Sequence, residues 1–240
     1  MIEQILANKR KEVLELGSVK RGHRQKPVRS LDLRQGTNII AELKRKSPSA
    51  GRINKIDDTR VAVYTRYATA ISVLTDNHYF GGSFDLLADV SRKTSLPVLC
   101  KDFIIDKAQI DLAYSKGADL ILLIAGILNE LELKDLYDYA RGKGLNCLVE
   151  VHTMEELERI SHLNADIIGV NARDLDTLSI DLSRAAEIMT CVQAPVKVAE
   201  SGIKSRFDME RVPGANCFLI GETLMRSEDL ESTFRGLLYG

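Results

Sequence analysis

The sequence predicts an α/β protein that folds as one closed (β/α)8 barrel, a TIM barrel, preceded by an extra helical segment. Short apolar segments alternate with amphipathic ones, and no linker or shift of composition divides them. Eight such units fit into about 200 residues, which favours closure into a barrel over the alternative, an open doubly wound sheet. We therefore expect a single domain over residues 1–240, with an N-terminal helical extension at 1–37 and the barrel at 38–240.

The extension begins with a predicted amphipathic helix over residues 2–16. Its apolar side chains recur at helical spacing, and Gly17 ends the pattern. These side chains are Ile2, Ile5, Leu6, Val13 and Leu16. A basic stretch without acidic residues follows, and it is either a solvated loop or a cationic collar near an anionic ligand. Its charged residues are Lys20, Arg21, Arg24, Lys26 and Arg29.

Eight short segments in the rest of the chain have the composition of buried strands. Several are almost continuously apolar, as in DLILLI and PVLCKDF, which is typical of strands that are covered on both faces. The predicted strands are Asn38–Lys44, Ala70–Thr75, Pro97–Phe103, Asp119–Ile124, Cys147–His152, Ile167–Asn171, Pro195–Ser201 and Cys217–Gly221. Amphipathic stretches between them, such as Glu130–Arg141 and Met154–Leu163, are interpreted as crossover helices.

Composition and charge limit the classes of function. Hydrophobic residues make up 45% of the chain and charged residues 28%, as in an ordinary globular protein. The net charge of −1 provides no overall field that would attract nucleic acid or an anionic membrane. No apolar run could span a membrane, and Lys9, Arg10 and Lys11 interrupt the start of the chain before a signal peptide could form. We expect a cytoplasmic protein with a small-molecule partner, and a monomer rather than an oligomer.

The cysteines and histidines show neither disulfide nor metal patterns. Cys100, Cys147, Cys191 and Cys217 form no CxxC pair, and three of them lie in or beside apolar runs, where reduced thiols that fill the core are expected. The four histidines form neither an HxxxH nor an HxH pair. We therefore expect a reducing compartment and no structural metal.

Charged and polar residues interrupt the apolar strands at their C-terminal ends. Burying an unpaired charge is costly, so each of these residues requires a partner or access to water. They are Glu42, Lys44, Lys101, Glu150, His152, Asn171, Arg173, Glu200 and Ser201. The active site of a β/α barrel lies at this end of its strands. A lysine and several carboxylates around one cavity suit proton transfer, whereas any one of them alone could simply reach solvent.

Glycines after the last two strands predict a phosphate site. Gly202 and Gly221 leave backbone N–H groups open to a ligand, and Ser201 adds a hydroxyl group. The loops after strands seven and eight commonly hold phosphate in barrels of this type; the alternative is that the glycines only form tight turns. The sequence SPSAG at 47–51 follows the first strand and is expected to be a flexible loop that closes over the ligand.

Longer motifs around these positions are NIIAELKRKSPSAG from Asn38, ISVLTDNHYFGGS from Ile71, PVLCKDFIID from Pro97, GADLILLI from Gly117, LVEVH from Leu148, IIGVNARDL from Ile167, VAESGI from Val198 and FLIGETLMR from Phe218. Together and in this order they closely resemble the indole-3-glycerol-phosphate synthase family of tryptophan biosynthesis. The resemblance spans the whole predicted barrel. It implies a carboxy-lyase that converts 1-(2-carboxyphenylamino)-1-deoxyribulose 5-phosphate into indole-3-glycerol phosphate with loss of carbon dioxide and water, and it implies no cofactor.

The resemblance also implies four catalytic roles. Lys101 would be the general acid that protonates the ketose carbonyl during ring closure, and Glu150 would be the acid/base partner in the later dehydration. Lys44 would hold the substrate carboxylate and assist proton transfer, while Glu42 would orient the lysines by pairing with them. Which of the two lysines protonates the substrate at each step stays open.

The remaining roles implied by the resemblance concern binding. Asn171, Arg173 and Glu200 would contact the anthranilate ring and the hydroxyl groups, while Ser47 would belong to the mobile loop and Phe80 to an aromatic wall. Phosphate would bind to Ser201, Gly202 and Gly221. Cys100 and Asp76 depart from the residues usual in the family, which concerns the surroundings of the site rather than the reaction.

Two other functions remain as alternatives. A Schiff-base aldolase acting on a sugar phosphate would also place a lysine at a strand end of a phosphate-binding barrel. A barrel that has lost catalysis and serves binding or assembly is the second alternative. It predicts degraded residues at the mouth, whereas Lys101, Glu150, Glu42 and Lys44 are all present.

Overall fold

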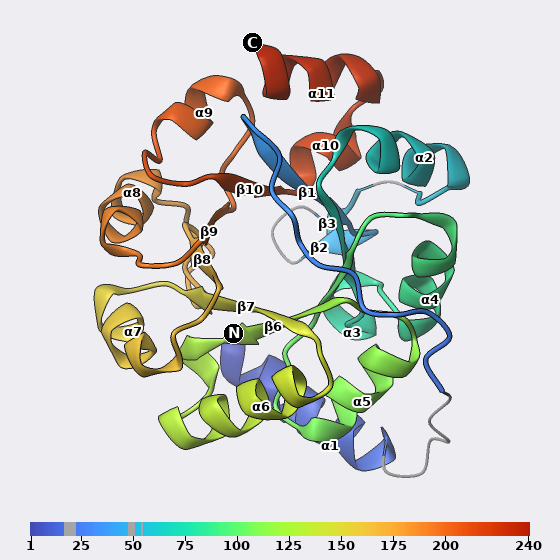
Figure 1. The fold of residues 1–240 in the computed structure, drawn as a ribbon, viewed down its shortest axis with the longest axis vertical. Helices are drawn as coiled ribbons and strands as arrows, with labels where there is room; N and C mark the ends of the chain where they lie inside the picture. The colour runs from blue at the N-terminus through green and yellow to red at the C-terminus, as the bar shows by residue number, and fades with distance from the viewer. Residues whose placement is uncertain (17–22, 48–50, 54) are drawn as a thin grey trace.

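Eight parallel strands close into a barrel that helices surround (Figure 1). The structure, a computed structural model, describes residues 1–16, 23–47, 51–53 and 55–240. The barrel strands are β1 (Asn38–Leu43), β4 (Ala70–Leu74), β5 (Val98–Lys101), β6 (Leu120–Ile124), β7 (Asn146–Val151), β8 (Ile167–Asn171), β9 (Val196–Glu200) and β10 (Cys217–Ile220). Each pairs with its neighbour in the sequence, and β10 pairs with β1 to close the ring. The predicted barrel and its eight strands are confirmed, with ends within two residues of the predicted ones.

The helices cover the outside of the strands. They are α1 (Ile2–Leu16), α2 (Asp58–Tyr67), α3 (Asn77–Phe80), α4 (Phe84–Lys93), α5 (Lys107–Ser115), α6 (Glu130–Gly142), α7 (Met154–Arg159), α8 (Leu182–Cys191), α9 (Arg206–Glu210), α10 (Glu222–Arg226) and α11 (Leu230–Tyr239), with 3-10 turns η1 (Ala125–Ile127) and η2 (Ser161–Leu163). A short antiparallel pair, β2 (Lys46–Ser47) and β3 (Gly51–Arg52), follows β1. Side-chain caps begin most helices; at α6, Asn129 and Glu132 satisfy each other's backbone N–H groups.

The alternation of side chains along each strand divides the core into two parts. Inward residues fill the barrel with apolar side chains such as Ile40, Leu99, Leu148 and Leu219. Outward residues pack beneath the helices in a larger cluster. Because the side-chain period of a strand is two, the next inward position beyond these apolar residues lies at the C-terminal mouth of the barrel.

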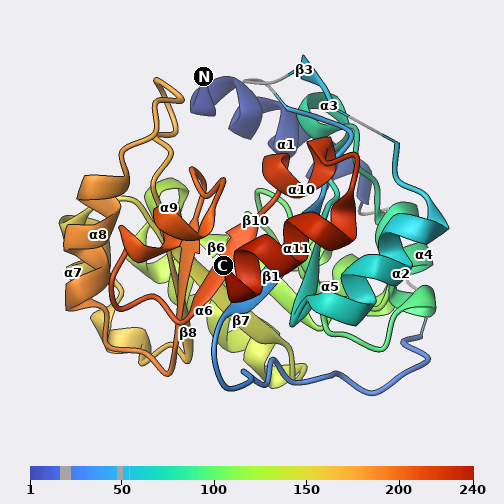
Figure 2. The same ribbon diagram turned by 90° about the horizontal axis from the view of Figure 1, so that it is seen from above.

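The predicted N-terminal helix is confirmed as α1, which lies across the mouth of the barrel. Figure 2 shows α1 with β3 and α3 at one end of the barrel, whereas residues 23–37 cross the opposite end. Ile5 on α1 is almost fully buried, and Ile2 and Ile5 both line the cavity at the mouth. Within the described residues, no helix is long and apolar enough to cross a membrane.

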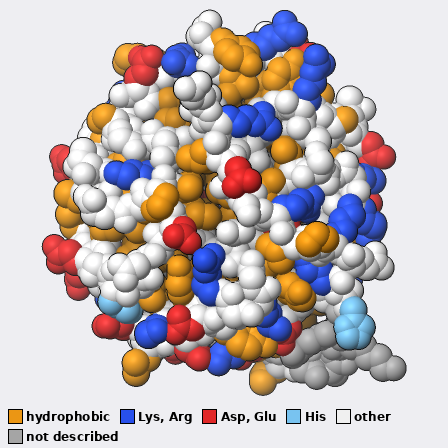
Figure 3. Space-filling model, viewed as in Figure 1, with side chains coloured by type: hydrophobic (Ala, Val, Ile, Leu, Met, Phe, Trp, Pro, Cys, Tyr) orange, Lys and Arg blue, Asp and Glu red, His pale blue; other side chains and the backbone are white. Residues whose placement is uncertain are grey.

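Two arginines of the basic stretch have a structural role that neither interpretation predicted, whereas Lys26 is exposed, as in a solvated loop. Arg24 and Arg29 form ion pairs of 2.6 Å with Asp119, whose side chain is fully buried at the start of β6. These residues lie at the end of the barrel opposite the mouth, so the hypothesis of a collar around an anionic ligand is wrong for both arginines. Lys20 and Arg21 lie outside the described residues. Figure 3 shows the end of the barrel opposite the mouth, where acidic and basic side chains are interspersed.

The cysteines behave as predicted. Cys100, Cys147 and Cys217 are buried free thiols in the strands, and Cys191 is free and exposed. Burial raises the pKa of each of the three buried thiols to about 12, which keeps them protonated and unreactive at neutral pH.

Candidate active site

The mouth of the barrel contains a cavity of about 520 Å³ that receives side chains from most of the strands. The predicted residues that line it are Glu42, Lys44, Phe80, Lys101, Glu150, Asn171, Arg173, Glu200, Ser201, Gly202 and Gly221. The structure therefore brings together every predicted site residue whose side chain it describes. Ser47 belongs to β2, but its side chain lies outside the described part of the chain. Apolar walls come from Leu74, Leu122 and Phe103. Ile71, on the neighbouring face of β4, points outward into the core beneath the helices.

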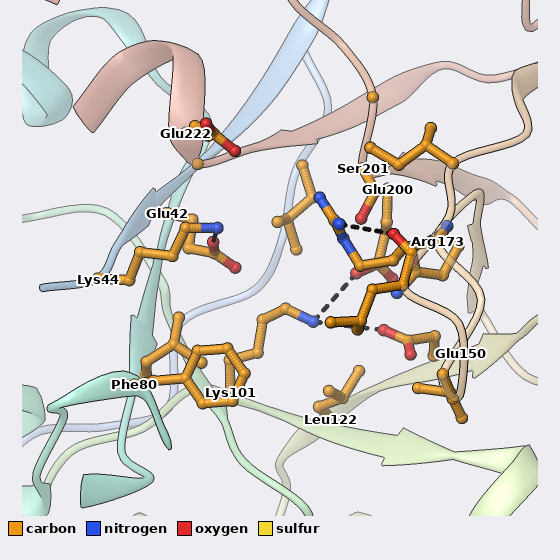
Figure 4. A pocket seen from close by; sticks show the side chains of 18 of the residues that line it. Glu42, Lys44, Phe80, Lys101, Leu122, Glu150, Arg173, Glu200, Ser201 and Glu222 are labelled. Atoms are coloured by element: carbon orange, nitrogen blue, oxygen red, sulfur yellow. Dashed lines mark hydrogen bonds and ion pairs between the residues drawn. The ribbon is translucent and has the colours of Figure 1, made fainter. Parts of the chain in front are cut away.

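Lys101 lies between two carboxyl groups at the centre of the cavity (Figure 4). Its Nζ is 3.3 Å from Oε2 of Glu150 and 3.2 Å from Oε2 of Glu200. Burial alone would lower the pKa of Lys101, but the carboxylates of Glu200, Glu150 and Glu42 outweigh it and hold this pKa above its usual value. These carboxyl groups therefore favour the ammonium form of Lys101, which is a proton donor at the centre of the cavity.

The two acidic partners of Lys101 differ in their ionisation. Burial would raise the pKa of Glu150, but Lys101 and His152 outweigh burial and hold it below the usual range. Burial and the neighbouring Glu150 raise the pKa of Glu200, against the opposing effect of Lys101. Two close carboxyl groups do not easily ionise together, and the directions of the two pKa shifts favour protonation of Glu200 before Glu150. The buried Oε1 of Glu200 has no hydrogen-bond partner among the described residues.

Glu42 and Lys44 form a second pair beside Lys101. Oε1 of Glu42 is 2.8 Å from Nζ of Lys44. Burial opposes ionisation of Glu42, but Lys44 and Lys101 hold its pKa below the usual value. Gly221 allows this arrangement, because a Cβ atom at that position would lie 2.2 Å from the same Glu42 oxygen. The expected pairing of Glu42 with a lysine is thus present at Lys44, with Lys101 acting through its charge.

Two further predicted residues shape the loop after β8. The backbone N–H of Arg173 donates to Oδ1 of Asn171 at 3.0 Å, and Arg173 Nη1 donates to the Leu178 carbonyl at 2.9 Å. These contacts direct the Arg173 guanidinium into the cavity (Figure 4).

The predicted aromatic residue Phe80 packs in a tilted arrangement against Phe103, with ring centroids 6.3 Å apart. One side of the cavity is therefore aromatic and another cationic.

The loops after β9 and β10 line the cavity with Ser201, Gly202 and Gly221. Ser201 and Gly202 both adopt a positive φ, at 66° and 78°, which turns the chain sharply after β9. Glu222, an unfavourable neighbour for an anion, is tied to Arg226 by an ion pair of 3.0 Å along α10. No group of three or more His, Cys, Asp or Glu residues within the described chain is arranged to hold a metal ion.

The sequence model of one family, described as indole-3-glycerol phosphate synthase, matches residues 2–237. The chain belongs to the indole-3-glycerol phosphate synthase family. An indole-3-glycerol phosphate synthase of Bacillus cereus strain G9842 is 43% identical over 98% of this chain and 96% of its own length. One from Staphylococcus haemolyticus strain JCSC1435 is 44% identical over 90% of this chain and 85% of its own.

Solved structures with low sequence identity share the fold. A 3-hexulose-6-phosphate synthase superimposes with a TM-score of 0.66 at 14% identity, covering 84% of this chain and 98% of its own. A thiamine phosphate pyrophosphorylase from Pyrococcus furiosus superimposes with a TM-score of 0.60 at 18% identity, covering 84% of this chain and 93% of its own.

The sequence analysis missed the part that α1 plays in this member of the indole-3-glycerol phosphate synthase family. Nζ of Lys9 is 2.8 Å from Asp102 and 3.0 Å from Asp76, and all three side chains are buried. The sequence does contain a signal for these ion pairs, because Lys9 occupies the apolar stripe of the helix between Ile5 and Val13. A charge in such a stripe predicts a buried partner.

Proposed function

We propose that the chain closes the ring of 1-(2-carboxyphenylamino)-1-deoxyribulose 5-phosphate to form indole-3-glycerol phosphate, carbon dioxide and water. The observation that carries this proposal is the buried ammonium of Lys101 between Glu150 and Glu200, at the mouth of a barrel that belongs to this family. The reaction needs an acid near a ketone, a base near a C–H bond and an anchor for phosphate. Each requirement has candidate residues in the cavity.

Lys101 is the proposed acid of ring closure. The ring carbon that bears the carboxylate attacks the ketose carbonyl carbon, a C–C bond forms, and the carbonyl electron pair moves to oxygen. The Lys101 ammonium stabilises and protonates that oxygen, a contribution of about 10²–10⁴ in rate for a positioned acid. Its raised pKa supports this role, because the proton is present throughout the neutral range.

Lys44 is the proposed partner of the substrate carboxylate, with Glu42 fixing its position. Decarboxylation then returns the electrons of the breaking C–C bond to the cationic ring. Walls formed by Phe80, Leu74 and Leu122 support this step, because a dry enclosure favours the loss of charge.

Glu150 is the proposed base of the dehydration. It takes a proton from the former methylene carbon beside nitrogen, while the hydroxyl group leaves as water with a proton from an acid of the cavity. The lowered pKa of Glu150 keeps it in the carboxylate form that a base requires, and the raised pKa of Glu200 supports that residue as a hydrogen-bond donor to a substrate hydroxyl. Asn171 and Arg173 are proposed to orient the anthranilate ring.

The phosphate group is proposed to bind the backbone at Ser201, Gly202 and Gly221. The position of these residues in the cavity lining, at the ends of β9 and β10, supports this site, as does the ion pair that holds Glu222 to Arg226. Ser47 is proposed to contact the substrate from the loop after β1.

The direct test is to incubate the purified chain with the carboxyphenylamino substrate and follow the fluorescence of indole-3-glycerol phosphate. Borohydride reduction in the presence of ketose phosphates tests the aldolase alternative. A covalent adduct at Lys101, with no indole product, would replace our proposal with the aldolase. An ammonium at Lys101 argues against that outcome, because a Schiff base requires the free amine. Absence of both product and adduct would favour a barrel that only binds.

We also propose that the chain works as a single-domain monomer over residues 1–240 in the cytoplasm. Three cysteines are buried free thiols, which supports a reducing compartment. Light scattering coupled to size-exclusion chromatography tests the monomer, and a dimer mass would contradict it.

A further inference from the structure

His152 lies between two carboxylates directly behind the proposed base. It follows β7, two residues after Glu150, and its side chain is almost fully buried. Its Nε2 is 3.2 Å from Oε1 of Glu150, an ion-pair distance without hydrogen-bond geometry, and its Nδ1 is 3.4 Å from Oε2 of Glu156. The ring is absent from the lining of the cavity, so it reaches the substrate only through Glu150.

An imidazole with a carboxylate at each nitrogen favours double protonation. A neutral ring has only one N–H group, so one of its nitrogens would direct a lone pair at an anionic oxygen. Burial lowers the pKa of His152, but Glu150 and Glu156 outweigh burial and raise it to about 10. His152 is then an imidazolium ion throughout the neutral range.

Glu156 is fixed in its position behind the ring. Its Oε2 accepts a hydrogen bond of 2.6 Å from the backbone N–H of His152. Gly126 in η1 makes room for the carboxylate, because a Cβ atom there would lie 2.7 Å from Glu156 Oε1. The Thr153 hydroxyl accepts from the Glu156 N–H and so starts α7 at this point. The Glu156 carboxylate is therefore held in a fixed position behind His152 and does not move freely at the surface.

Glu150 meets charges on several sides of the barrel. Lys101 on β5, Glu200 on β9, Glu42 on β1 and His152 after β7 all act on it. The neighbouring strands add no charge, because β6 is entirely apolar and β8 places Gly169 opposite Glu150. His152 and Lys101 are the cations that act most strongly against protonation of Glu150.

We propose that His152 is a positioning residue whose imidazolium ion binds one oxygen of Glu150, directs the other oxygen to Lys101 and keeps the proton of the acidic pair on Glu200. This inference rests on the proposed function, in which Glu150 is the base of the dehydration. Without the imidazolium, the proton of the pair moves toward Glu150, and the base is lost at a higher pH than in the wild type.

The test compares the pH dependence of kcat for the wild type and His152→Gln. Glutamine keeps hydrogen-bonding capacity but carries no charge. We expect the acid limb of the profile to move upward by about one pH unit, so that kcat at a fixed pH on that limb falls about tenfold, with KM changed less than about threefold. The control is His162→Gln, on the partly exposed turn η2, which should leave the profile in place. Superimposable profiles for the wild type and His152→Gln would overturn the proposal.

A second measurement is made on the wild-type chain. Nitrogen-15 NMR of the wild-type histidine side chains, with His152 assigned by its absence from His152→Gln or from a sample labelled in fragments, reports the protonation of both ring nitrogens. Both should be protonated at pH 7. A neutral ring there would overturn the proposal even if the variant fails to fold. If the wild type does not turn over the substrate, the proposed function fails instead, and the NMR result is unaffected.

Discussion

The ammonium of Lys9 lies 2.8 Å from Oδ1 of Asp102, the residue that directly follows Lys101 in the chain. Asp102 also accepts hydrogen bonds from Thr75 and from the N–H of Phe103, so it joins α1 to the ends of β4 and β5. Asp76 completes the cluster and caps α3, which carries Phe80. A helix outside the barrel is thus connected through one buried cation to the segments that hold the proposed acid and the aromatic wall.

Lys9→Met should destabilise the fold and weaken substrate binding. The change leaves Asp76 and Asp102 without their shared cation, which costs about 3 kcal/mol when such a pair is buried. Loosening of α1 should also raise KM, because Ile2 and Ile5 line the cavity. Urea unfolding and steady-state kinetics measure the two effects. Lys11→Met, at an exposed position of the same helix, is the matched control, and equal stability of the two variants would contradict the account.

Gly221→Ala should reduce turnover by about a hundredfold, a loss expected when a catalytic group is displaced by about 1 Å. The backbone at Gly221 has φ of −114°, which alanine tolerates, so the effect would come from the new Cβ atom alone. That atom would lie 2.2 Å from Oε1 of Glu42 and 3.1 Å from Nζ of Lys44. Gly236→Ala, in α11 with open space around it, should keep full activity and gain slight stability. Wild-type kcat in Gly221→Ala would refute the packing argument.

Asp119→Asn should lower stability without changing catalysis. Asp119 pairs with Arg24 and Arg29 and accepts the Val98 N–H at the end of the barrel away from the cavity. Loss of its charge should reduce the free energy of unfolding by about 3 kcal/mol, measured in urea. The ratio kcat/KM at a temperature where the variant is folded should match the wild type. A selective rise in KM would instead restore the hypothesis of a cationic collar.

Glu200→Gln should impair the enzyme less than Glu150→Gln. Burial and Glu150 raise the pKa of Glu200, so it is protonated in the neutral range and glutamine imitates its neutral form. Glu150 has a lowered pKa, so glutamine removes a required carboxylate. The directions of these two pKa shifts predict that kcat of the wild type falls at acid pH, as Glu150 gains a proton, and at alkaline pH, as Glu200 loses one. The expected gap between the variants is at least about tenfold in kcat at pH 7, and the reverse order would contradict the assignment.

The mouth of the barrel could be predicted because strands obey a period of two. Glu42, Lys101, Glu150 and Glu200 each occupy the inward position next after an apolar one, so the sequence alone predicted that they meet. The distances among them could not be predicted. Those depend on barrel closure and on spaces such as the one at Gly169, where a Cβ atom would lie 2.2 Å from Glu200 Oε1.

Contacts between distant elements escaped the sequence analysis. The pairing of Lys9 with Asp102 and of Arg24 with Asp119 depends on how the N-terminal extension wraps both ends of the barrel. No local pattern specifies that path, and the basic stretch was therefore assigned to solvent or to a ligand. His152 was recognised as a residue at a strand end, but its role depends on Glu156, which reaches it only when α7 folds back.

Lys101→Ala tests the central claim most directly. Lys101 is the proposed acid of ring closure, and its ammonium is the group that both Glu150 and Glu200 face. With the fold verified by circular dichroism, we expect kcat for formation of indole-3-glycerol phosphate to fall at least about a hundredfold, while Lys107→Ala on the exposed face of α5 keeps the wild-type rate. Equal rates for Lys101→Ala and the wild type would contradict the account.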